Sequence, residues 1–276
     1  MLNEFLPPED PEGSAIIEVE DLHLSFAGIK AIDGVSFSVG AGELFAIIGP
    51  NGAGKTSIFN CISGAYHPQQ GAISFQGQDL LGMKPNKIAD LGVARTFQNI
   101  ELFSQLTVLD NLMLGRHQHI EYGTPAAMLR IGKAAREEAR NRDIVEGIIE
   151  FLDIAVFRRS FVAMLPYGIQ KRVELGRALA MEPKLLLLDE PAAGMNLEET
   201  EDMARFITDI RRELKIGIIL VDHDMRMVMD LSDRLLVIDF GSPIATGTPA
   251  EVQRNPDVIR AYLGQEHAIA DERGGS

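Results

Sequence analysis

The chemistry-bearing residues of this chain begin with a glycine-rich segment behind a short apolar run. Residues 49–56 read Gly-Pro-Asn-Gly-Ala-Gly-Lys-Thr and follow Leu44–Ile48, which predicts a buried strand. Glycines at this spacing let the backbone curl until successive N–H groups point inward, at the positive end of the helix expected next, and such a loop binds phosphate oxygens. Lys55 can reach the β- and γ-phosphates of a nucleotide, and the Thr56 hydroxyl suits Mg²⁺. The segment therefore predicts a nucleotide site rather than a chance glycine turn. The residues expected to contact the nucleotide here are Gly49, Asn51, Gly52, Ala53, Gly54, Lys55, Thr56 and Ser57.

Such a loop needs acidic partners, and two carboxylates stand at the end of a second apolar run. Leu185–Leu188 predicts a buried strand, and Asp189 and Glu190 follow it directly. Because successive strand residues point to opposite sides, the two acids are expected to do different work. Asp189 is placed to hold Mg²⁺, directly or through water, and Glu190 to orient and polarise an attacking water. The alternative is a pair of solvated acids at a strand end.

The elements that must position these residues alternate in type along the chain. Apolar residues alternate imperfectly over Ile17–Phe26 and Val35–Val39, which predicts half-buried antiparallel strands. Further apolar runs, and the amphipathic helices between them, are expected at Ile216–Val221, Leu235–Ile238, Gln170–Met181, Leu197–Leu214 and Met225–Leu231. Strands that alternate with helices predict βαβ units and a parallel sheet, so the fold class is α/β.

The middle third of the chain differs, because it carries helix signals and almost no strand signal. Thr107 followed by Asp110 resembles a helix N-cap with an acidic first turn. Asn196 with Glu199 likewise fits a capping box at the start of a later helix. We expect a helical subdomain inserted into a split core, with a flexible N-terminus and tail. The expected division is residues 1–14 (flexible), 15–99 with 171–264 (core), 100–170 (helical subdomain) and 265–276 (flexible).

Composition limits the classes of protein to consider. The 276 residues allow one large or two modest domains at ~150 residues each. Lys and Arg number 26 against 40 Asp and Glu, and the formal charge of −14 argues against a nucleic-acid partner. Cys61, the single cysteine, excludes an intrachain disulfide, fits a reducing compartment and is expected to be a small buried side chain. His117 and His119 lack a third metal ligand nearby and are expected at the surface. No apolar run approaches the ~18 residues of a membrane span and the N-terminus does not read as a signal peptide, so a soluble cytoplasmic chain is expected.

Four segments occur in an order that is typical of one ATPase family. The glycine-rich loop is followed by Gln98 in Thr-Phe-Gln-Asn, then by the Asp-Glu pair, then by His223 in Val-Asp-His-Asp. In this order the chain resembles, over nearly its whole length, the nucleotide-binding subunit of an ATP-binding cassette (ABC) transporter. It resembles most closely the ATPases of branched-chain (hydrophobic) amino-acid importers, through Ala94–Asn99, Asp189–Asn196 and Asn255–Gly264.

The resemblance implies a fold, a nucleotide and a set of roles. The fold would be a P-loop NTPase (RecA-like) core with an N-terminal antiparallel β subdomain and an inserted α-helical subdomain. The nucleotide would be ATP, hydrolysed with Mg²⁺, and the catalytic residues would be Glu190, Gln98 and His223. Gln98 would sense Mg²⁺ and water and complete a metal set with Thr56 and Asp189, and His223 would contact the γ-phosphate.

Two further nucleotide contacts follow from the resemblance. Phe26 would stack on the adenine, with core packing as the alternative. The signature segment reads Leu-Pro-Tyr-Gly-Ile-Gln over residues 165–170, where the family commonly has Leu-Ser-Gly-Gly-Gln. Pro166, Tyr167 and Gly168 would touch ATP held by the other subunit of a dimer. Pro166 provides neither a hydroxyl nor an N–H, although it suits the first turn of a helix, so this composite site is expected to be weaker.

The resemblance also implies partners. These are two transmembrane permease subunits, a second and paralogous ATPase subunit or a second copy of this chain, and indirectly a periplasmic or extracellular solute-binding protein, with no nucleic acid. The chain would lie peripherally on the cytoplasmic side of the cell membrane. An apolar cluster stands where the family's permeases dock, although subdomain core is the alternative: Phe97, Ile100, Leu102 and Phe103. An ATPase of the lipopolysaccharide-export type and a non-transport ABC ATPase remain as alternative functions. The sequence does not identify the transported solute.

Overall fold

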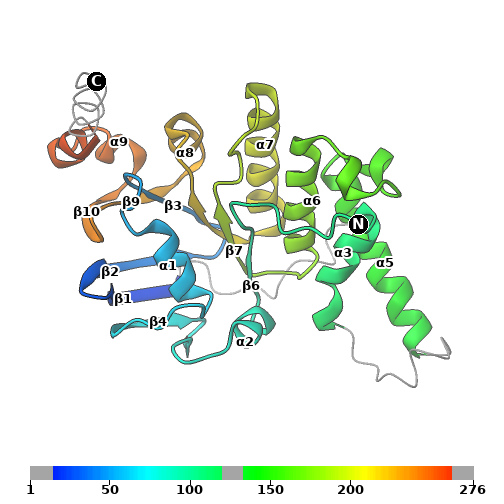
Figure 1. Cartoon of the computed structure of the whole chain (residues 1–276), viewed down its shortest axis with the longest axis horizontal. Helices are drawn as coiled ribbons and strands as arrows, with labels where there is room; N and C mark the ends of the chain where they lie inside the picture. The colour runs from blue at the N-terminus through cyan, green and yellow to red at the C-terminus, as the bar shows by residue number, and fades with distance from the viewer. Residues whose placement is uncertain (1–14, 120–132, 263–276) are drawn as a thin grey trace.

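The computed structural model describes residues 15–119 and 133–262 (Figure 1). The segments expected to be flexible, 1–14 and 265–276, lie outside the described residues. The strands are β1 (Ala15–Phe26), β2 (Ile29–Gly40), β3 (Leu44–Ile48), β4 (Gln70–Phe75), β5 (Gln78–Asp79), β6 (Val93–Arg95), β7 (Leu185–Asp189), β8 (Gly217–Val221), β9 (Arg234–Asp239) and β10 (Ser242–Gly247). The α-helices are α1 (Lys55–Ile62), α2 (Pro85–Asp90), α3 (Val108–Gly115), α5 (Lys133–Phe151), α6 (Tyr167–Leu179), α7 (Leu197–Leu214), α8 (Met225–Leu231) and α9 (Pro249–Val252). Short 3₁₀ turns are η2 (His117–His119), η3 (Ala155–Phe157) and η4 (Val162–Met164).

A mixed sheet with the strand order β10-β9-β3-β8-β7-β6 forms the centre of the molecule. Strands β9, β3, β8, β7 and β6 run parallel, and β10 pairs antiparallel with β9 at one edge. The apolar runs predicted as strands are confirmed as β3, β7, β8 and β9. Strands β6 and β10 were not predicted, because β6 has three residues, too few to show a period, and β10 is only partly buried. The carboxyl ends of parallel strands meet at one edge of a sheet, so the segments that follow β3, β6 and β7 lie close together.

The central sheet separates two hydrophobic cores. Side chains alternate along each strand, as β7 illustrates. Leu186 and Leu188 pack into the core that α3, α5, α6 and α7 cover. Leu185 and Leu187 pack into a second core, which α1 and the antiparallel sheet cover. Each strand of the parallel sheet therefore supports both halves of the molecule.

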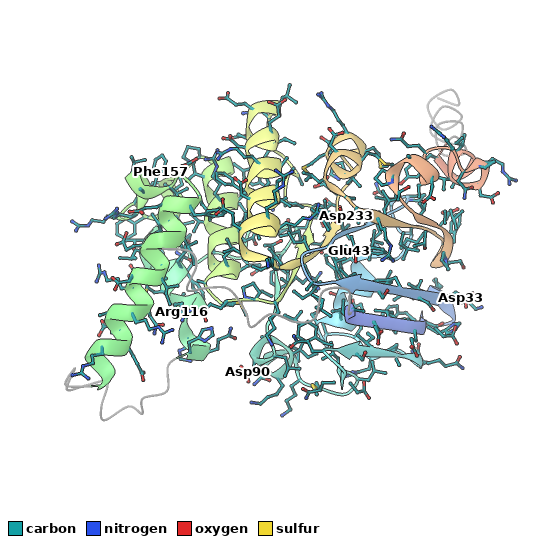
Figure 2. All side chains as sticks on the ribbon, turned by 180° about the vertical axis from the view of Figure 1, so that it is seen from behind. Asp33, Glu43, Asp90, Arg116, Phe157 and Asp233 are labelled. Carbon is teal, nitrogen blue, oxygen red and sulfur yellow. The ribbon has the colours of Figure 1, made fainter. Side chains whose placement is uncertain are left out.

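The antiparallel sheet has the order β2-β1-β4-β5. The predicted pairing of two half-buried N-terminal strands is confirmed, since β1 and β2 form an antiparallel hairpin. Its turn, Ala27 and Gly28, has positive φ at both residues, 46° and 87°, as tight hairpin turns require. The backbone N–H of Asp33 donates to the carbonyl of Gly241 at 2.9 Å and ties the hairpin to the turn between β9 and β10. Figure 2 shows Asp33 at the outer end of this sheet.

The helices α3, α5 and α6 gather at the opposite end of the molecule (Figure 1). Thr107 caps α3 as predicted, because its Oγ1 accepts the N–H of Asp110 at 3.2 Å. Arg116, labelled in Figure 2, directly follows α3 and is buried. Its guanidinium donates to Asn141 Oδ1 of α5 at 3.0 Å and to the carbonyl of Ala180, after α6, at 2.9 Å. One buried side chain thus joins three helices. Among the described residues, no helix is long and apolar enough to cross a membrane.

Predictions about single residues and helix bounds elsewhere in the chain had mixed outcomes. Cys61 is buried, as predicted. Helix α6 begins at Tyr167, three residues before the predicted start, so Pro166 takes the N-cap position and not the first turn. His117 is exposed, and His119 is half-buried at the surface, with its Nε2 3.0 Å from the carbonyl of Met181.

Candidate functional site

The glycine-rich loop connects the carboxyl end of β3 to α1, and close packing requires glycine at two of its positions, 49 and 54. Gly54 forms the N-cap of α1 with φ 106°, and a Cβ there would overlap the carbonyl oxygen of Ala31. A Cβ on Gly49 would overlap a carbonyl oxygen of β9. Neither position accepts a side chain unless the backbone moves. Lys55 folds back over this loop, and its Nζ donates to the carbonyls of Gly49 at 2.6 Å and Pro50 at 2.9 Å.

A pocket of about 400 Å³ opens beside the loop. Its lining residues are Ala31, Asn51, Gly52, Ala53, Gly54, Lys55, Thr56, Ser57, Gln98 and Glu190. Most of the loop residues predicted to contact a nucleotide therefore face one pocket, together with two of the predicted catalytic residues. Burial lowers the pKa of Lys55, and the carboxylates of Glu190 and Asp189 oppose that shift. An anionic ligand in the pocket would add to the stabilisation of the Lys55 cation.

The two acids at the end of β7 point in different directions for a reason that strand alternation does not supply. Asp189 is the last residue of β7 and is 3% exposed, with its Oδ2 2.8 Å from the guanidinium of Arg95. Glu190 lies beyond the strand in the left-handed region, with φ 49°. This backbone turn sends the Glu190 side chain into the pocket, whereas Asp189 stays beside the sheet. Asp189 is therefore not a solvated acid.

Gln98 and His223 approach the same oxygen of Glu190 from different parts of the chain. The Nε2 of Gln98 donates to Glu190 Oε2 at 2.8 Å. The Nδ1 of His223 lies 3.7 Å from that oxygen, and the His223 side chain is 66% exposed. Buried Asp222 accepts the N–H groups of His223 at 2.7 Å and Asp224 at 2.9 Å, which fixes the turn that carries the histidine. The fold thus brings the three predicted catalytic residues together.

The predicted metal ligands offer oxygen atoms of the kinds that Mg²⁺ prefers. Thr56 supplies a hydroxyl, Gln98 an amide carbonyl and Asp189 a carboxylate, and Thr56 and Gln98 both line the pocket. Arg95 contacts Oδ2 of Asp189, and a carboxylate has a second oxygen that can face a cation or its water. The donor set fits Mg²⁺.

Phe26 lies at the end of β1, next to the hairpin turn. Its side chain is 45% exposed, so it is not a core residue. Its ring meets the ring of Tyr66 edge to face, with the centroids 5.1 Å apart. Ala31, which follows the same turn, lines the phosphate pocket. An exposed aromatic face near the pocket is compatible with base stacking.

The signature residues do not join the pocket. Pro166, Tyr167 and Gly168 begin α6, and the pocket lining includes none of them. A Cβ on Gly168 would overlap the carboxylate of Glu199 in α7, so the start of α6 packs against the start of α7. The capping box predicted for α7 is confirmed, because Asn196 Oδ1 accepts the N–H of Glu199 at 3.0 Å and the Glu199 carboxylate accepts the N–H of Asn196 at 3.1 Å.

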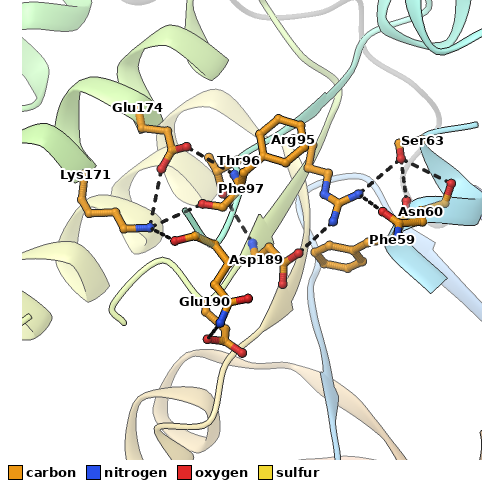
Figure 3. Close-up of polar contacts among 11 residues, drawn as sticks. Phe59, Asn60, Ser63, Arg95, Thr96, Phe97, Lys171, Glu174, Asp189 and Glu190 are labelled. Atoms are coloured by element: carbon orange, nitrogen blue, oxygen red, sulfur yellow. Dashed lines mark hydrogen bonds and ion pairs between the residues drawn. The ribbon is translucent and has the colours of Figure 1, made fainter. Parts of the chain in front are cut away.

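Three charged residues that our sequence reasoning did not select lie beside the site (Figure 3). Arg95 holds Asp189, and its guanidinium also donates to Asn60 Oδ1 of α1 at 2.7 Å. Lys171 and Glu174 lie on α6, are both 2% exposed, and contact the backbone around Gln98. A lysine and a glutamate three residues apart on this amphipathic helix were the signal that could have revealed the second pair.

Comparisons with known proteins agree with this geometry. The model of the ABC transporter family matches residues 32–193, and the model "Branched-chain amino acid ATP-binding cassette transporter" matches residues 242–268. The chain is 40% identical to the high-affinity branched-chain amino acid transport ATP-binding protein BraF of Pseudomonas aeruginosa, over 91% of this chain and 98% of that protein. It is 39% identical to LivG of Salmonella typhimurium, which has the same description, with the same coverage.

Two further matches have a lower sequence identity to this chain. The lipopolysaccharide export system ATP-binding protein LptB of Haemophilus influenzae is 34% identical, over 92% of this chain and the whole of that protein. The solved ADP conformation of an ATP-binding cassette of an ABC transporter superposes with a TM-score of 0.79 and 29% identity, over 91% of this chain and 99% of that one. The fold is the P-loop NTPase fold that was predicted. The chain belongs to the ABC transporter family, as an ATP-hydrolysing, ATP-binding subunit.

Proposed function

We propose that this chain drives the uptake of branched-chain or related hydrophobic amino acids by hydrolysing ATP. The convergence of Lys55, Gln98 and Glu190 on one pocket carries the hydrolytic part of the proposal. The identity to BraF and LivG over nearly the whole chain supports the choice of solute. The lower identity to LptB makes lipopolysaccharide export the weaker alternative.

In the proposed reaction a water oxygen bonds to the γ-phosphorus of ATP while the bond to the β–γ bridging oxygen breaks, which releases ADP and phosphate. Glu190 orients the water and takes its proton. Gln98 holds the Glu190 carboxylate from one side, at 2.8 Å. His223, whose Nδ1 lies 3.7 Å from the same carboxylate, is assigned the contact with the γ-phosphate. Lys55 and the N–H groups of the loop bind the β- and γ-phosphates. Mg²⁺, held by Thr56, Gln98 and Asp189, supplies charge neutralisation on the phosphates when it is bound.

The apolar cluster beside Gln98 supports contact with a membrane subunit. Phe97 and Phe103 are exposed and line a groove of about 500 Å³ between the central sheet and the helical end. Ile100 and Leu102 are half-buried, and Leu102 packs against the core. Exposed aromatic side chains in an apolar groove fit a short amphipathic helix of a partner. We assign this groove to a permease subunit on the cytoplasmic side of the membrane.

The signature supports a dimer with two unequal sites. Pro166 gives the α6 N-cap position neither a hydroxyl nor an N–H, so this chain offers fewer donors to an ATP held by the other subunit. Pairing with a second, paralogous ATPase subunit would place the full site on this chain's Lys55 and Glu190. A homodimer would use the weaker signature twice.

The substitution Glu190→Gln tests the hydrolytic assignment. Without the base, hydrolysis is expected to slow by ~10²–10⁴-fold while ATP binding is retained. Sizing the variant with ATP and Mg²⁺ should show the ATP-bound dimer accumulate. Glu213→Gln, an exposed acid at the end of α7, is the matched control and should hydrolyse normally. Near-normal turnover of a monomeric Glu190→Gln variant would remove Glu190 from the mechanism.

A further inference from the structure

Helix α6 carries a row of charged side chains on the face that it turns toward Gln98. Lys171, Glu174 and Arg177 are spaced three residues apart, which places them on one side of the helix. Lys171 and Glu174 are each 2% exposed. Charges this deeply buried are costly unless hydrogen bonds and opposite charges satisfy them. The groups that contact Lys171 and Glu174 therefore indicate the role of these two residues.

Those partners are backbone groups of one short segment, residues 97–101 (Figure 3). Lys171 Nζ donates to the carbonyl of Gln98 at 2.9 Å and lies 3.4 Å from the carbonyl of Phe97. Glu174 Oε1 accepts the N–H groups of Phe97 at 3.4 Å and Glu101 at 3.5 Å. Lys171 and Glu174 also pair with each other at 3.6 Å. Lys171 thus binds backbone carbonyls of the segment, and Glu174 binds its backbone N–H groups.

A third contact closes the same segment. Arg177 donates to the carbonyl of Glu101, so the row on α6 reaches both ends of residues 97–101. The pKa of Glu174 lies above its ordinary value because burial outweighs the opposing effects of Lys171, Arg177 and the two N–H donors. Gln98 is the one residue of the segment whose side chain reaches Glu190, at 2.8 Å.

We propose that Lys171 and Glu174 are positioning residues for ATP hydrolysis, which set the place of Gln98 relative to Glu190. The proposal rests on the proposed roles of Gln98 and Glu190. Because the backbone of Gln98 is bonded to α6, and the signature residues begin α6, the segment and the signature helix form one unit. A shift of α6 carries Gln98 with it and changes its contact with Glu190.

A double-mutant cycle on the purified full chain tests the proposal. The variants are Glu174→Gln, Gln98→Ala and the two combined, and the measurements are kcat and KM for MgATP. If Glu174 acts through Gln98, Glu174→Gln lowers kcat by roughly 10- to 100-fold with little change in KM, as expected for a misplaced catalytic group. In the Gln98→Ala background the same substitution should then lower kcat no further.

Arg172→Met provides the matched control, because Arg172 is the neighbouring basic residue of α6 and pairs with Asp202 instead of residues 97–101. Any fold-change in kcat caused by Arg172→Met should multiply with the fold-change caused by Gln98→Ala. The positioning role is overturned if the kcat loss of Glu174→Gln likewise multiplies with that of Gln98→Ala, or if Glu174→Gln changes only KM. In either case the role of Gln98 stands. A Gln98→Ala variant with unchanged kcat overturns the proposed role of Gln98 and the inference with it.

A second variant distinguishes a loss of catalysis from a loss of the fold. Lys171→Met combined with Glu174→Leu replaces the buried pair by apolar side chains of similar volume, an exchange that proteins often tolerate. It should keep the cooperative thermal unfolding of the parent chain and still show the loss of kcat. A folded variant of this kind with the parent kcat overturns the proposal.

Discussion

Lys55 is the residue on which we expect phosphate binding in the pocket to depend most. Its Nζ lies within hydrogen-bond distance of two loop carbonyls, and Lys55 lines the pocket together with the other residues from 51 to 57. Lys55→Ala should weaken ATP binding by roughly 10- to 100-fold, since a hydrogen bond to a charged group contributes about 1.5–3 kcal/mol. Titration of the purified variant with ATP measures this loss.

The matched control is Lys30→Ala, an exposed lysine on β2 beside the same pocket wall. It should bind ATP as the parent chain does. Unchanged affinity and normal hydrolysis in Lys55→Ala would show that the nucleotide site lies elsewhere.

Cys61 gives a pH prediction at the same scale. Burial raises the pKa of its thiol from 9.0 to about 12. Below pH 9 the thiol is protonated in both the folded and the unfolded chain. Above pH 9 the unfolded chain releases the proton and the folded chain keeps it, so the free energy of unfolding falls, by at most about 1.4 kcal/mol per pH unit.

Urea unfolding at pH 8 and pH 10 measures this dependence. The variant Cys61→Ala should lose less stability between the two pH values than the parent chain, and other titrating groups cancel in the comparison. Equal losses in both chains would mean that the thiol does not contribute.

The residues of the site differ in how far the sequence predicted them. Lys55 and Glu190 follow from their motifs, and the divergence of Asp189 from Glu190 was also predicted. Its cause was not, because the positive φ of Glu190 depends on the backbone and not on strand alternation. Arg95 could not be selected, since its partners lie 35 and 94 residues away in the chain.

At the scale of elements, the start of α7 offers a stability test. Asn196 and Glu199 satisfy each other's N–H groups in a capping box. Asn196→Ala should lower the free energy of unfolding by about 1 kcal/mol, because the N–H of Glu199 loses its acceptor. For a chain of this size that corresponds to a fall in Tm of about 2–4 °C. Differential scanning calorimetry measures it, and Asn196→Ser, which keeps an acceptor, is the control that should restore most of the loss.

The elements themselves were predicted where their pattern is long or uniformly apolar. β3, β7, β8, β9 and α7 were found in this way. β6 was not predicted because a strand of three residues has no visible period, although Arg95 at its end reaches the site. The first turn of α6 was not included because the amphipathic period is visible only from Gln170. In the structure, Gly168 in that turn packs against Glu199.

At the scale of the whole molecule, the Pro166 signature leads to a prediction about assembly. The isolated chain should hydrolyse ATP slowly and dimerise poorly, and a cognate second ATPase with the membrane subunits should raise the rate per subunit. Pro166→Ser should raise the activity of the isolated chain, with a gain of about 0.5–1.5 kcal/mol for the added hydrogen bond. Equal rates per subunit alone and in the purified complex, with a stable ATP-bound homodimer, would contradict unequal sites.

The division of the protein into two cores by the central sheet bears on how such cassettes can be recombined. Leu186 and Leu188 pack with the helical end, and Leu185 and Leu187 pack beneath the phosphate loop, although the four are chain neighbours. Substitutions on one face leave the contacts of the other face in place, so their effects on stability should add. A chimera can therefore exchange the helical side, with the strand residues that face it, for that of a related cassette and keep the nucleotide side intact. The boundary of such an exchange therefore separates alternate side chains of each strand, and it does not separate one continuous segment of the chain from the next.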